Sequence, residues 1–238
     1  MKFWENRKRI LVILAHPDDP EFFCGATLAK WSREGHEVSY CLLTRGEKGI
    51  NDSFKEIPRI IELREKEQLE AASIIGVEKV TFLKNQDGFL EPTIDLRKQI
   101  VRIIRMEKPD IVVSCDPSNF YIRDNYINHP DHRAAGLAVI DAIFPAAGNE
   151  LFFNDLITQE SLSPHQISEV WLSLPKEQNT VIDVTDHWEI KLKALEKHES
   201  QIGEIKQFRE KMIARRAKGS NSINPRYEEA FRRITFKD

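Results

Sequence analysis

The stretch LVILAHPDD, residues 11–19, changes from a continuous apolar run to a histidine, a proline and two aspartates. An apolar run without polar alternation is typical of a strand that is buried on both faces of a parallel sheet. The run therefore predicts a central strand, from about residue 9 to residue 15, that carries His16, Asp18 and Asp19 to one edge of a sheet.

A second polar cluster, HPDH, occupies residues 129–132. Zinc and similar divalent ions favour imidazole nitrogen and carboxylate oxygen, and a catalytic site holds three protein ligands with one position left for water. His16, Asp19 and His132 satisfy that count. Asp18 is left beside a ligand, where a carboxylate can serve as the general base of a hydrolase, and His129 is its partner across the site.

Each cluster also has a purely structural interpretation, because His-Pro-Asp can form an ordinary turn whose aspartate caps the next helix. A single cluster would not decide between the two interpretations. Two clusters, each where an α/β protein places its active site, favour function.

Strands and helices alternate along the chain, which predicts an α/β fold with a Rossmann-like, open, mostly parallel sheet flanked by helices. The expected strands are 9–15, 37–44, 79–83 and 110–115, and the expected helices are 22–34, 58–75, 96–107 and 133–143. Ligands in such sheets lie where the strand order reverses, so the first and fourth strands should flank the site. No Gly-x-Gly-x-x-Gly pattern follows the first strand, which argues against a dinucleotide cofactor.

The segments around this core are less regular. Residues 45–55 are expected to form a loop that borders the site, and residues 116–128 to be irregular. Late strands are expected at 168–174 and 180–184, and a helix at 189–201 whose His198 is interpreted as structural. We expect a single domain over 1–238, with a core at about 8–205 and a smaller C-terminal extension at about 206–238.

Composition sets further limits on function. The formal net charge of −3 gives no long-range attraction for nucleic acid. Three cysteines are too few for a disulfide framework and indicate a reducing compartment. The charged N-terminus lacks the apolar core of a signal peptide, and no apolar stretch reaches the length of a membrane span, so a cytoplasmic protein is expected.

These motifs resemble those of the PIG-L/LmbE-type zinc-dependent N-deacetylases, which carry Ala-His-Pro-Asp-Asp near the N-terminus and His-Pro-Asp-His further on. Similarity extends over about residues 8–205. It includes LTRGEKG at 43–49, the spacing of Arg64, Glu67 and Ala71, the Asp87-Gly88 pair, and HESQ at 198–201.

The resemblance implies a role for each site residue. His16, Asp19 and His132 would hold one Zn2+ per chain, with Fe2+ as the alternative. Asp18 would activate the water, His129 would stabilise or protonate the transition state, and Asp131 would orient His129. Arg64 and Asp87 would contribute to the substrate pocket.

Two positions depart from the family pattern. Pro20 is inserted after the second aspartate, so Glu21 is displaced by one position. Ile127 lies two residues before His129, where some sugar-deacetylating relatives place a tyrosine that polarises the carbonyl. Tyr121 and Tyr126 are the candidates to replace it.

The expected activity is hydrolysis of an acetyl group from an N-acetylated amino sugar, a glycoside or a related small N-acyl compound. Two alternatives stay open: a non-catalytic module that binds a sugar or metabolite, and a metal-dependent phosphoesterase, which would bring two metals. The apolar segments 143–145 and 151–153 belong either to the core or to the interface of a homo-oligomer.

Overall fold

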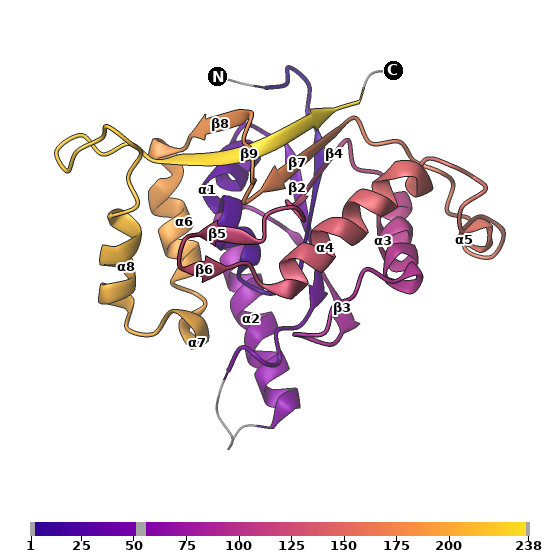
Figure 1. The fold of residues 1–238 in the computed structure, drawn as a ribbon, viewed down its shortest axis with the longest axis horizontal. Helices are drawn as coiled ribbons and strands as arrows, with labels where there is room; N and C mark the ends of the chain where they lie inside the picture. Colours follow the sequence, from indigo (N-terminus) through magenta and orange to yellow (C-terminus); the bar gives the residue numbers. More distant parts are fainter. Residues whose placement is uncertain (1–2, 51–55, 237–238) are drawn as a thin grey trace.

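A mixed sheet runs through the molecule, with helices on both of its faces (Figure 1). The computed structural model describes residues 3–50 and 56–236, so the end of the predicted loop 45–55 lies outside the described residues. Within them, the main sheet has seven strands in the order β3-β2-β1-β4-β7-β9-β8. The strands are β1 (Arg9–Leu14), β2 (Glu37–Thr44), β3 (Lys79–Asn85), β4 (Ile111–Cys115), β7 (Glu169–Ser173), β8 (Thr180–Asp183) and β9 (Glu228–Thr235). The fold is the expected α/β fold, and the strand order reverses between β1 and β4, which pair in parallel.

The helices connect and cover these strands. They are α1 (Asp19–Arg33), α2 (Ile57–Ile75), α3 (Ile94–Glu107), α4 (Pro130–Asp141), α5 (Asn154–Thr158), α6 (Trp188–Leu195), α7 (Glu199–Ile202) and α8 (Ile205–Ile213). A π-helical turn follows α4 at Ala142–Ala147, and a 3-10 turn precedes α6 at Thr185–His187. Within residues 3–50 and 56–236, every helix is too short or too polar to cross a lipid bilayer.

Strand β1 is buried on both faces, as its apolar run predicts. Val12 and Leu14 belong to a core with residues of α1, α2 and α6. Leu11 and Ile13 belong to a second core with residues of α3 and α4. Because neighbouring residues of a strand point to opposite faces, one continuous apolar run supplies both layers.

The C-terminal extension is integrated into the sheet. Strand β9 lies between β7 and β8 and is antiparallel to both. The Glu229 carboxylate accepts hydrogen bonds from the main-chain N–H groups of Ala26 and Thr27, and it forms an ion pair with Lys191 at 2.6 Å. This contact lies just after Cys24, where α1 departs from helical geometry, so the last strand satisfies amides that the bend leaves free.

Three local differences from the predicted elements have physical reasons. Helix α1 begins at Asp19, earlier than expected, because Pro20 is well tolerated in a first helical turn. The stretch 116–128 contains a hairpin of β5 (Tyr121–Arg123) and β6 (Tyr126–Ile127), whose aromatic and β-branched residues favour strands. The predicted helix 189–201 is divided into α6 and α7 around His198, which turns inward and is fully buried.

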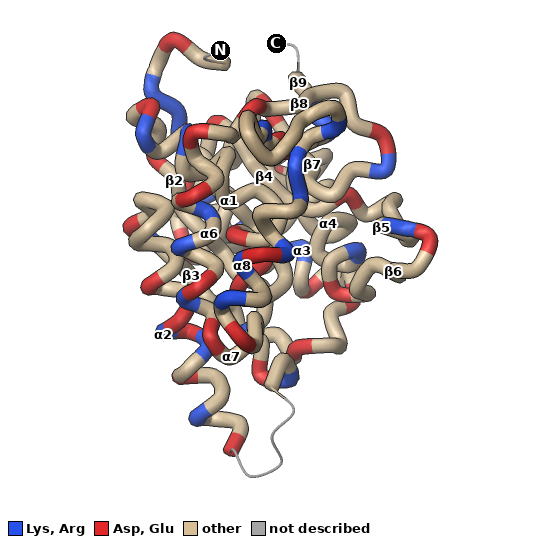
Figure 2. The backbone as a smooth tube through the Cα atoms, turned by 90° about the vertical axis from the view of Figure 1, so that its left-hand side faces the viewer, with Lys and Arg blue, Asp and Glu red and all other residues tan. Residues whose placement is uncertain are grey.

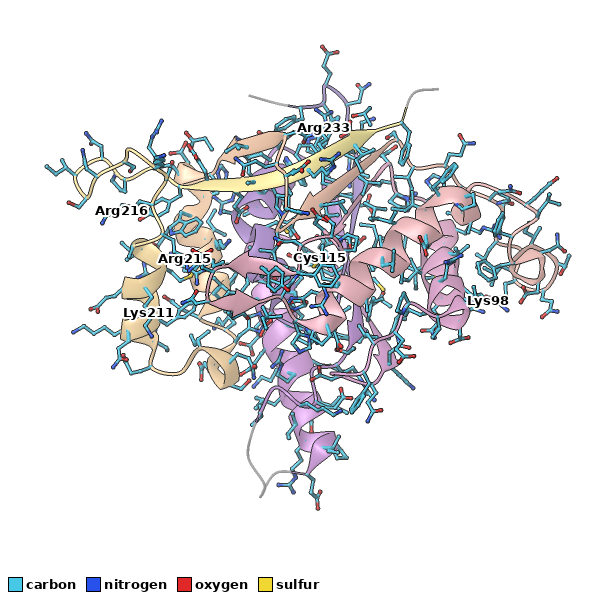
Figure 3. All side chains as sticks on the ribbon, viewed as in Figure 1. Lys98, Cys115, Lys211, Arg215, Arg216 and Arg233 are labelled. Atoms are coloured by element: carbon cyan, nitrogen blue, oxygen red, sulfur yellow. The ribbon has the colours of Figure 1, made fainter. Side chains whose placement is uncertain are left out.

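The two apolar segments after α4 divide between core and surface. Ile143, Phe152 and Phe153 pack against the core, whereas Phe144 and Leu151 are 73% and 82% exposed. Acidic and basic residues are interspersed along the backbone in Figure 2. Cys115 lies at the centre of the molecule in Figure 3, and all three cysteines are buried thiols.

Candidate metal centre and active site

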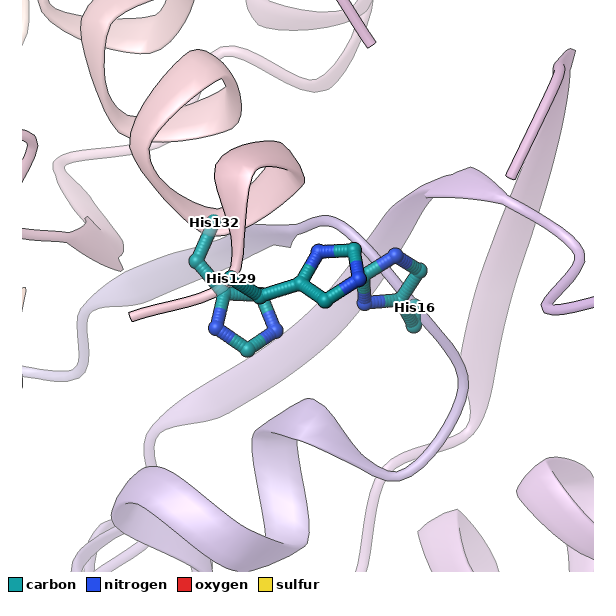
Figure 4. A group of neighbouring side chains, drawn as sticks. All are labelled: His16, His129 and His132. Atoms are coloured by element: carbon teal, nitrogen blue, oxygen red, sulfur yellow. The ribbon is translucent and has the colours of Figure 1, made fainter. Parts of the chain in front are cut away.

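Both polar clusters lie where β1 and β4 end. His16 lies two residues after the end of β1, while His129 caps the N-terminus of α4 and His132 lies in its first turn. The three imidazoles converge from these two segments, as Figure 4 shows. The ring centroid of His16 is 4.9 Å from that of His129 and 5.2 Å from that of His132. The fold therefore joins clusters that are more than 100 residues apart in the sequence.

The Asp19 carboxylate lies between the two predicted histidine ligands. Its Oδ1 is 3.1 Å from Nε2 of His132, and its Oδ2 is 3.4 Å from Nδ1 of His16. Tetrahedral zinc ligands at about 2.1 Å from the ion are about 3.4 Å from one another, so each of these two separations is compatible with two ligands of one ion. Burial would raise the pKa of Asp19, but His132 and His16 together hold it well below its ordinary value. The donor set of two imidazoles and one carboxylate thus suits Zn2+ or Fe2+.

The opposite nitrogen of each imidazole contacts a side chain that orients the ring. Nε2 of His16 is 3.1 Å from Asp87 Oδ1 and 3.1 Å from Asp131 Oδ2. Nδ1 of His132 is 3.1 Å from the side-chain oxygen of Asn128, which is fully buried. Such contacts fix the tautomer and orientation of metal-binding histidines.

Charge in the site favours a cation. Burial lowers the pKa of His16, but Asp19, Asp131 and Asp87 outweigh burial and raise that pKa to about 12. The surrounding carboxylates therefore hold a positive charge at this position. A bound divalent ion would provide that charge without the His16 proton, because a ligating imidazole is neutral.

Two overlapping groups have metal-binding atoms within 4.8 Å of one another: His16, His129 and His132, and His16, Asp87 and Asp131. In the second group the carboxylates already accept main-chain N–H groups of Lys48, Gly88 and Leu90. Asp19 belongs to neither group. Its carboxylate faces Nδ1 of His16, whereas Asp87 and Asp131 face Nε2 of the same ring.

His129 is held as a neutral donor. Its Nδ1 accepts the main-chain N–H of Asp131 at 3.2 Å, which requires an unprotonated Nδ1 and leaves the ring proton on Nε2. Burial, together with the charges of His16 and His132, lowers the pKa of His129. The Asp131 carboxylate instead contacts His16, so the orienting contact that Asp131 makes with His129 comes from its main chain and not from its side chain.

Asp18 lies at the edge of the same cluster in a strained conformation. Its φ is 88°, in the left-handed region that few residues other than glycine adopt. Burial is the main cause that raises the pKa of Asp18 to about 6, against the opposing charge of Arg64. A carboxyl group with this pKa can accept and release a proton near neutral pH.

Arg64 and Asp87 both contact the turn that follows β1. Arg64 is 2% exposed, and its Nη2 donates to the main-chain oxygen of Pro17 and to Asp18 Oδ2, the latter at 3.3 Å. Asp87 contacts His16 and accepts the N–H of Lys48 at 2.8 Å. Both side chains are therefore placed to hold site residues.

The two departures from the family pattern have clear positions. Pro20 occupies the first turn of α1, and the displaced Glu21 is fully buried beneath the site. Ile127 is 71% exposed and pairs with Tyr121 across the hairpin, so these two side chains share one face of it. Tyr126 pairs with Arg123 instead.

Two buried polar residues around the site, Asn128 and Gln68, were not predicted from the sequence, and Glu21 and His198 were named there without a role in the site. Asn128 directly precedes His129, and Gln68 lies one helical turn after Arg64, on the same face of α2. These sequence positions are the features that could have indicated a role in the site. Neither position identifies the hydrogen-bond partner of the side chain, which depends on the folded structure.

Comparisons with known proteins show the family of this chain. A family model described as "PIG-L: GlcNAc-PI de-N-acetylase" matches residues 11–143, more than half of the chain. The chain is 37% identical over 197 residues to a diacetylchitobiose deacetylase of Thermococcus kodakarensis, covering 83% of this chain and 71% of that protein. It is 28% identical to a probable N-acetyl-alpha-D-glucosaminyl L-malate deacetylase 2 of Bacillus anthracis, covering 83% of each.

A solved structure, the N,N'-diacetylchitobiose deacetylase of Pyrococcus horikoshii complexed with its inhibitor MPG, superposes with a TM-score of 0.86 at 31% identity. The match covers 97% of this chain and 85% of that one. The fold alone does not determine the chemistry, since the 4-carboxy-2-hydroxymuconate hydratase GalB of Pseudomonas putida shares it at 19% identity with a TM-score of 0.74. The family match and the relative at 37% identity together show that this chain belongs to the PIG-L family.

Proposed function

We propose that this protein is a metal-dependent deacetylase that hydrolyses the acetamido group of an N-acetylglucosamine-type sugar or glycoside. One observation carries the proposal: the Asp19 carboxylate lies between Nδ1 of His16 and Nε2 of His132, with Asp18 and His129 beside them. The relatives named above, which are deacetylases of diacetylchitobiose and of a glucosaminyl malate, support the substrate class.

His16, Asp19 and His132 would hold one divalent ion. When bound, that ion supplies Lewis-acid polarisation of the acyl oxygen and lowers the pKa of water. Asp18 takes a proton from the attacking water as the C–O bond forms. The neutral His129 donates its Nε2–H to the oxygen on which negative charge develops.

Collapse of the tetrahedral species breaks the C–N bond. Asp18, whose pKa of about 6 lets it carry the proton, returns that proton to the leaving nitrogen. Acetate and a free amine are the products. Arg64 restrains Asp18 throughout through its contact at 3.3 Å.

The described geometry favours this activity over a two-metal phosphoesterase. The second group of metal-capable residues shares His16 with the first, and its carboxylates are occupied by main-chain amides. Two ions would have to share one imidazole ring. A single-metal centre makes no such demand.

The test combines metal content with acetate release. Protein purified without added metal should contain about one equivalent of zinc or iron, and acetate release from N,N'-diacetylchitobiose should stop after chelation. Asp18→Asn should keep the metal and lose about 10²-fold or more in kcat. Asp116→Asn is the matched control, because it makes the same change at the same edge of the sheet. The Asp116 carboxylate accepts the main-chain N–H groups of Ser118 and Lys176, so this variant should keep the wild-type kcat.

Two results would contradict the proposal. Full activity of Asp18→Asn would remove the base assignment. Absence of metal, together with no acetate release after zinc is restored, would favour a non-catalytic binding module, whereas two equivalents of metal would favour the phosphoesterase.

A further inference from the structure

We propose that Gln68 is a positioning residue: its carboxamide holds the left-handed turn that aims the Asp18 carboxylate, and Glu21 and His198 hold Gln68. This inference rests on the proposed function, in which Asp18 is the base. It assigns a role to three buried polar side chains that no step of the proposed mechanism uses.

The main chain of Asp18 needs external support. A left-handed conformation at a residue other than glycine is strained and persists only where surrounding contacts impose it. In this turn the N–H of Asp18 donates to Gln68 Oε1 at 2.8 Å, and the carbonyl oxygen of Asp18 accepts from the N–H of Phe22 at 3.0 Å. The side chain of Gln68, on α2, accepts the N–H of Asp18, and the main chain of α1 donates to its carbonyl oxygen.

The chemistry of Glu21 determines which way the Gln68 amide points. Nε2 of Gln68 is 3.1 Å from both carboxylate oxygens of Glu21. A carboxylate only accepts hydrogen bonds, so the NH2 group must face Glu21 and Oε1 must face Asp18. Gln68 and Glu21 are both fully buried, so water does not compete for these contacts.

His198 completes the chain of contacts from the C-terminal half of the protein. Its Nε2 is 3.2 Å from Glu21 Oε2, and the residue is fully buried between α6 and α7. The helical segment breaks at this residue, which places the imidazole under α1. Asp18, Gln68, Glu21 and His198 thus form one hydrogen-bonded series that joins α1, α2 and the segment between α6 and α7.

A neighbouring pair provides a matched control. Glu67, the residue before Gln68, accepts hydrogen bonds from the N–H and the hydroxyl of Ser200 at 2.8 and 2.7 Å. This pair joins α2 to α7 with partly buried hydrogen bonds of similar length. In the described structure neither residue bonds Asp18, so the pair shares the packing role of Gln68 without its proposed catalytic effect.

The experiment compares Gln68→Met, which keeps length and volume but cannot accept the Asp18 N–H, with Ser200→Ala. Gln68→Met should lower kcat by about 10- to 100-fold, because a small misplacement of a catalytic group has effects of this size. Its KM and its bound metal per chain should stay near the wild-type values. Ser200→Ala should lower the melting temperature and leave kcat unchanged.

Rescue separates positioning from general damage. Gln68→Glu alone should be impaired, because two carboxylates would face each other. The double variant Gln68→Glu/Glu21→Gln should recover most of kcat. In it the carboxylate at position 68 accepts the Asp18 N–H, and the amide at position 21 donates to that carboxylate and accepts from His198.

A crystal structure of Gln68→Met provides a readout that does not depend on activity, and Asp18 should leave its φ of 88°. The inference is overturned if Gln68→Met keeps wild-type kcat, if its kcat falls only in proportion to lost metal, or if Asp18 keeps its conformation. Lack of acetate release by the wild-type protein would instead refute the proposed function, and the conformation of Asp18 in the variant would still decide the role of Gln68.

Discussion

The side-chain oxygen of Asn128 lies 3.1 Å from Nδ1 of His132, and this contact turns Nε2 of His132 toward Asp19. The Asn128 amide is held in turn by its donation to the main-chain oxygen of Asn119 at 2.8 Å. Because Nδ1 of His132 must donate to this oxygen, the ring keeps a free Nε2 for a metal ion. The residue just before the second polar cluster therefore selects the tautomer of a proposed ligand.

Asn128→Ala should weaken metal binding by about 10- to 100-fold, which is the usual effect of losing such an orienting contact. Competition with a chelator measures the affinity. Asn119→Ala, which removes a hydrogen bond to the carbonyl of Leu174 in the same region, should have little effect on affinity. Unchanged affinity in Asn128→Ala would show that Nδ1 of His132 needs no fixed acceptor.

Gly136 lets α4 lie against the end of β4. A Cβ atom at this position would be 2.4 Å from the carbonyl oxygen of Cys115, a main-chain atom that cannot move aside. Gly136→Ala should displace α4, which carries His129 and His132, cost about 1–3 kcal/mol of stability, and weaken metal binding. Urea unfolding and the same chelator assay measure both effects.

Gly25→Ala is the control for this substitution. Its added methyl group would meet Lys191 at 3.5 Å, an ordinary contact, inside a helix that also borders the site. Stability and metal affinity should both be kept. Equal losses in the two variants would contradict the proposed contact of α4 with β4.

The Arg105 side chain binds the main chain of the segment that follows α4. The side chain is fully buried and donates to five main-chain oxygens between residues 146 and 153, at 2.9–3.4 Å. Arg105→Lys removes most of the donors, so the free energy of unfolding should fall by roughly 3 kcal/mol, since unsatisfied buried carbonyls are costly. The value of kcat should stay within twofold, because no contact links Arg105 to the site in the described residues. Arg102→Lys, at an exposed pair with Glu160, should change stability little.

Glu169 makes stability depend on pH. Its carboxylate accepts from Trp4 and Trp171, both at 2.9 Å, and from the guanidinium of Arg233, which Figure 3 labels on β9. Burial would raise the pKa of Glu169, but the contacts with Arg233, Trp4 and Trp171 lower it below its ordinary value. Its stabilising effect is therefore complete above the ordinary carboxyl pKa and is lost as the pH falls through the lowered pKa.

At pH 7, where the charged hydrogen bonds of Glu169 contribute, the free energy of unfolding of Glu169→Gln should be about 2 kcal/mol lower than that of the wild type. This difference in the free energy of unfolding should shrink toward pH 3. Urea unfolding across this range measures it. Glu160→Gln, in an exposed pair with Arg102, should show little difference at any pH. A constant difference for Glu169→Gln over the whole range would contradict the proposed charge effect.

Much of the architecture was predictable from local patterns. The apolar runs of β1 and β4 and the helix signals near Gly76 and Pro130 are local features of backbone chemistry. The reversal of strand order between β1 and β4 follows from the topology of parallel α/β sheets, which is why the two polar clusters could be placed at one edge. That three of their residues are metal ligands stays a prediction, although the structure brings the Asp19 carboxylate within 3.1 Å of His132 and 3.4 Å of His16.

Long-range contacts were not predictable in the same way. The insertion of β9 between β7 and β8 and the bond between Glu21 and His198 join residues that are far apart in the sequence. The sequence contains no periodic signal for either contact. Each polar side chain could equally have been solvated at the surface.

The strand and helix order and the residue types of the site follow from local sequence patterns, because apolar periodicity and ligand chemistry act over a few residues. Three features of the site follow only from the packing of distant segments: the nitrogen of each histidine that faces Asp19, the contact of the Asp131 carboxylate with His16, and the hydrogen bond from the main chain of Asp18 to Gln68. These outcomes depend on which donor meets which acceptor in a buried space. That pairing exists only when distant segments are packed together.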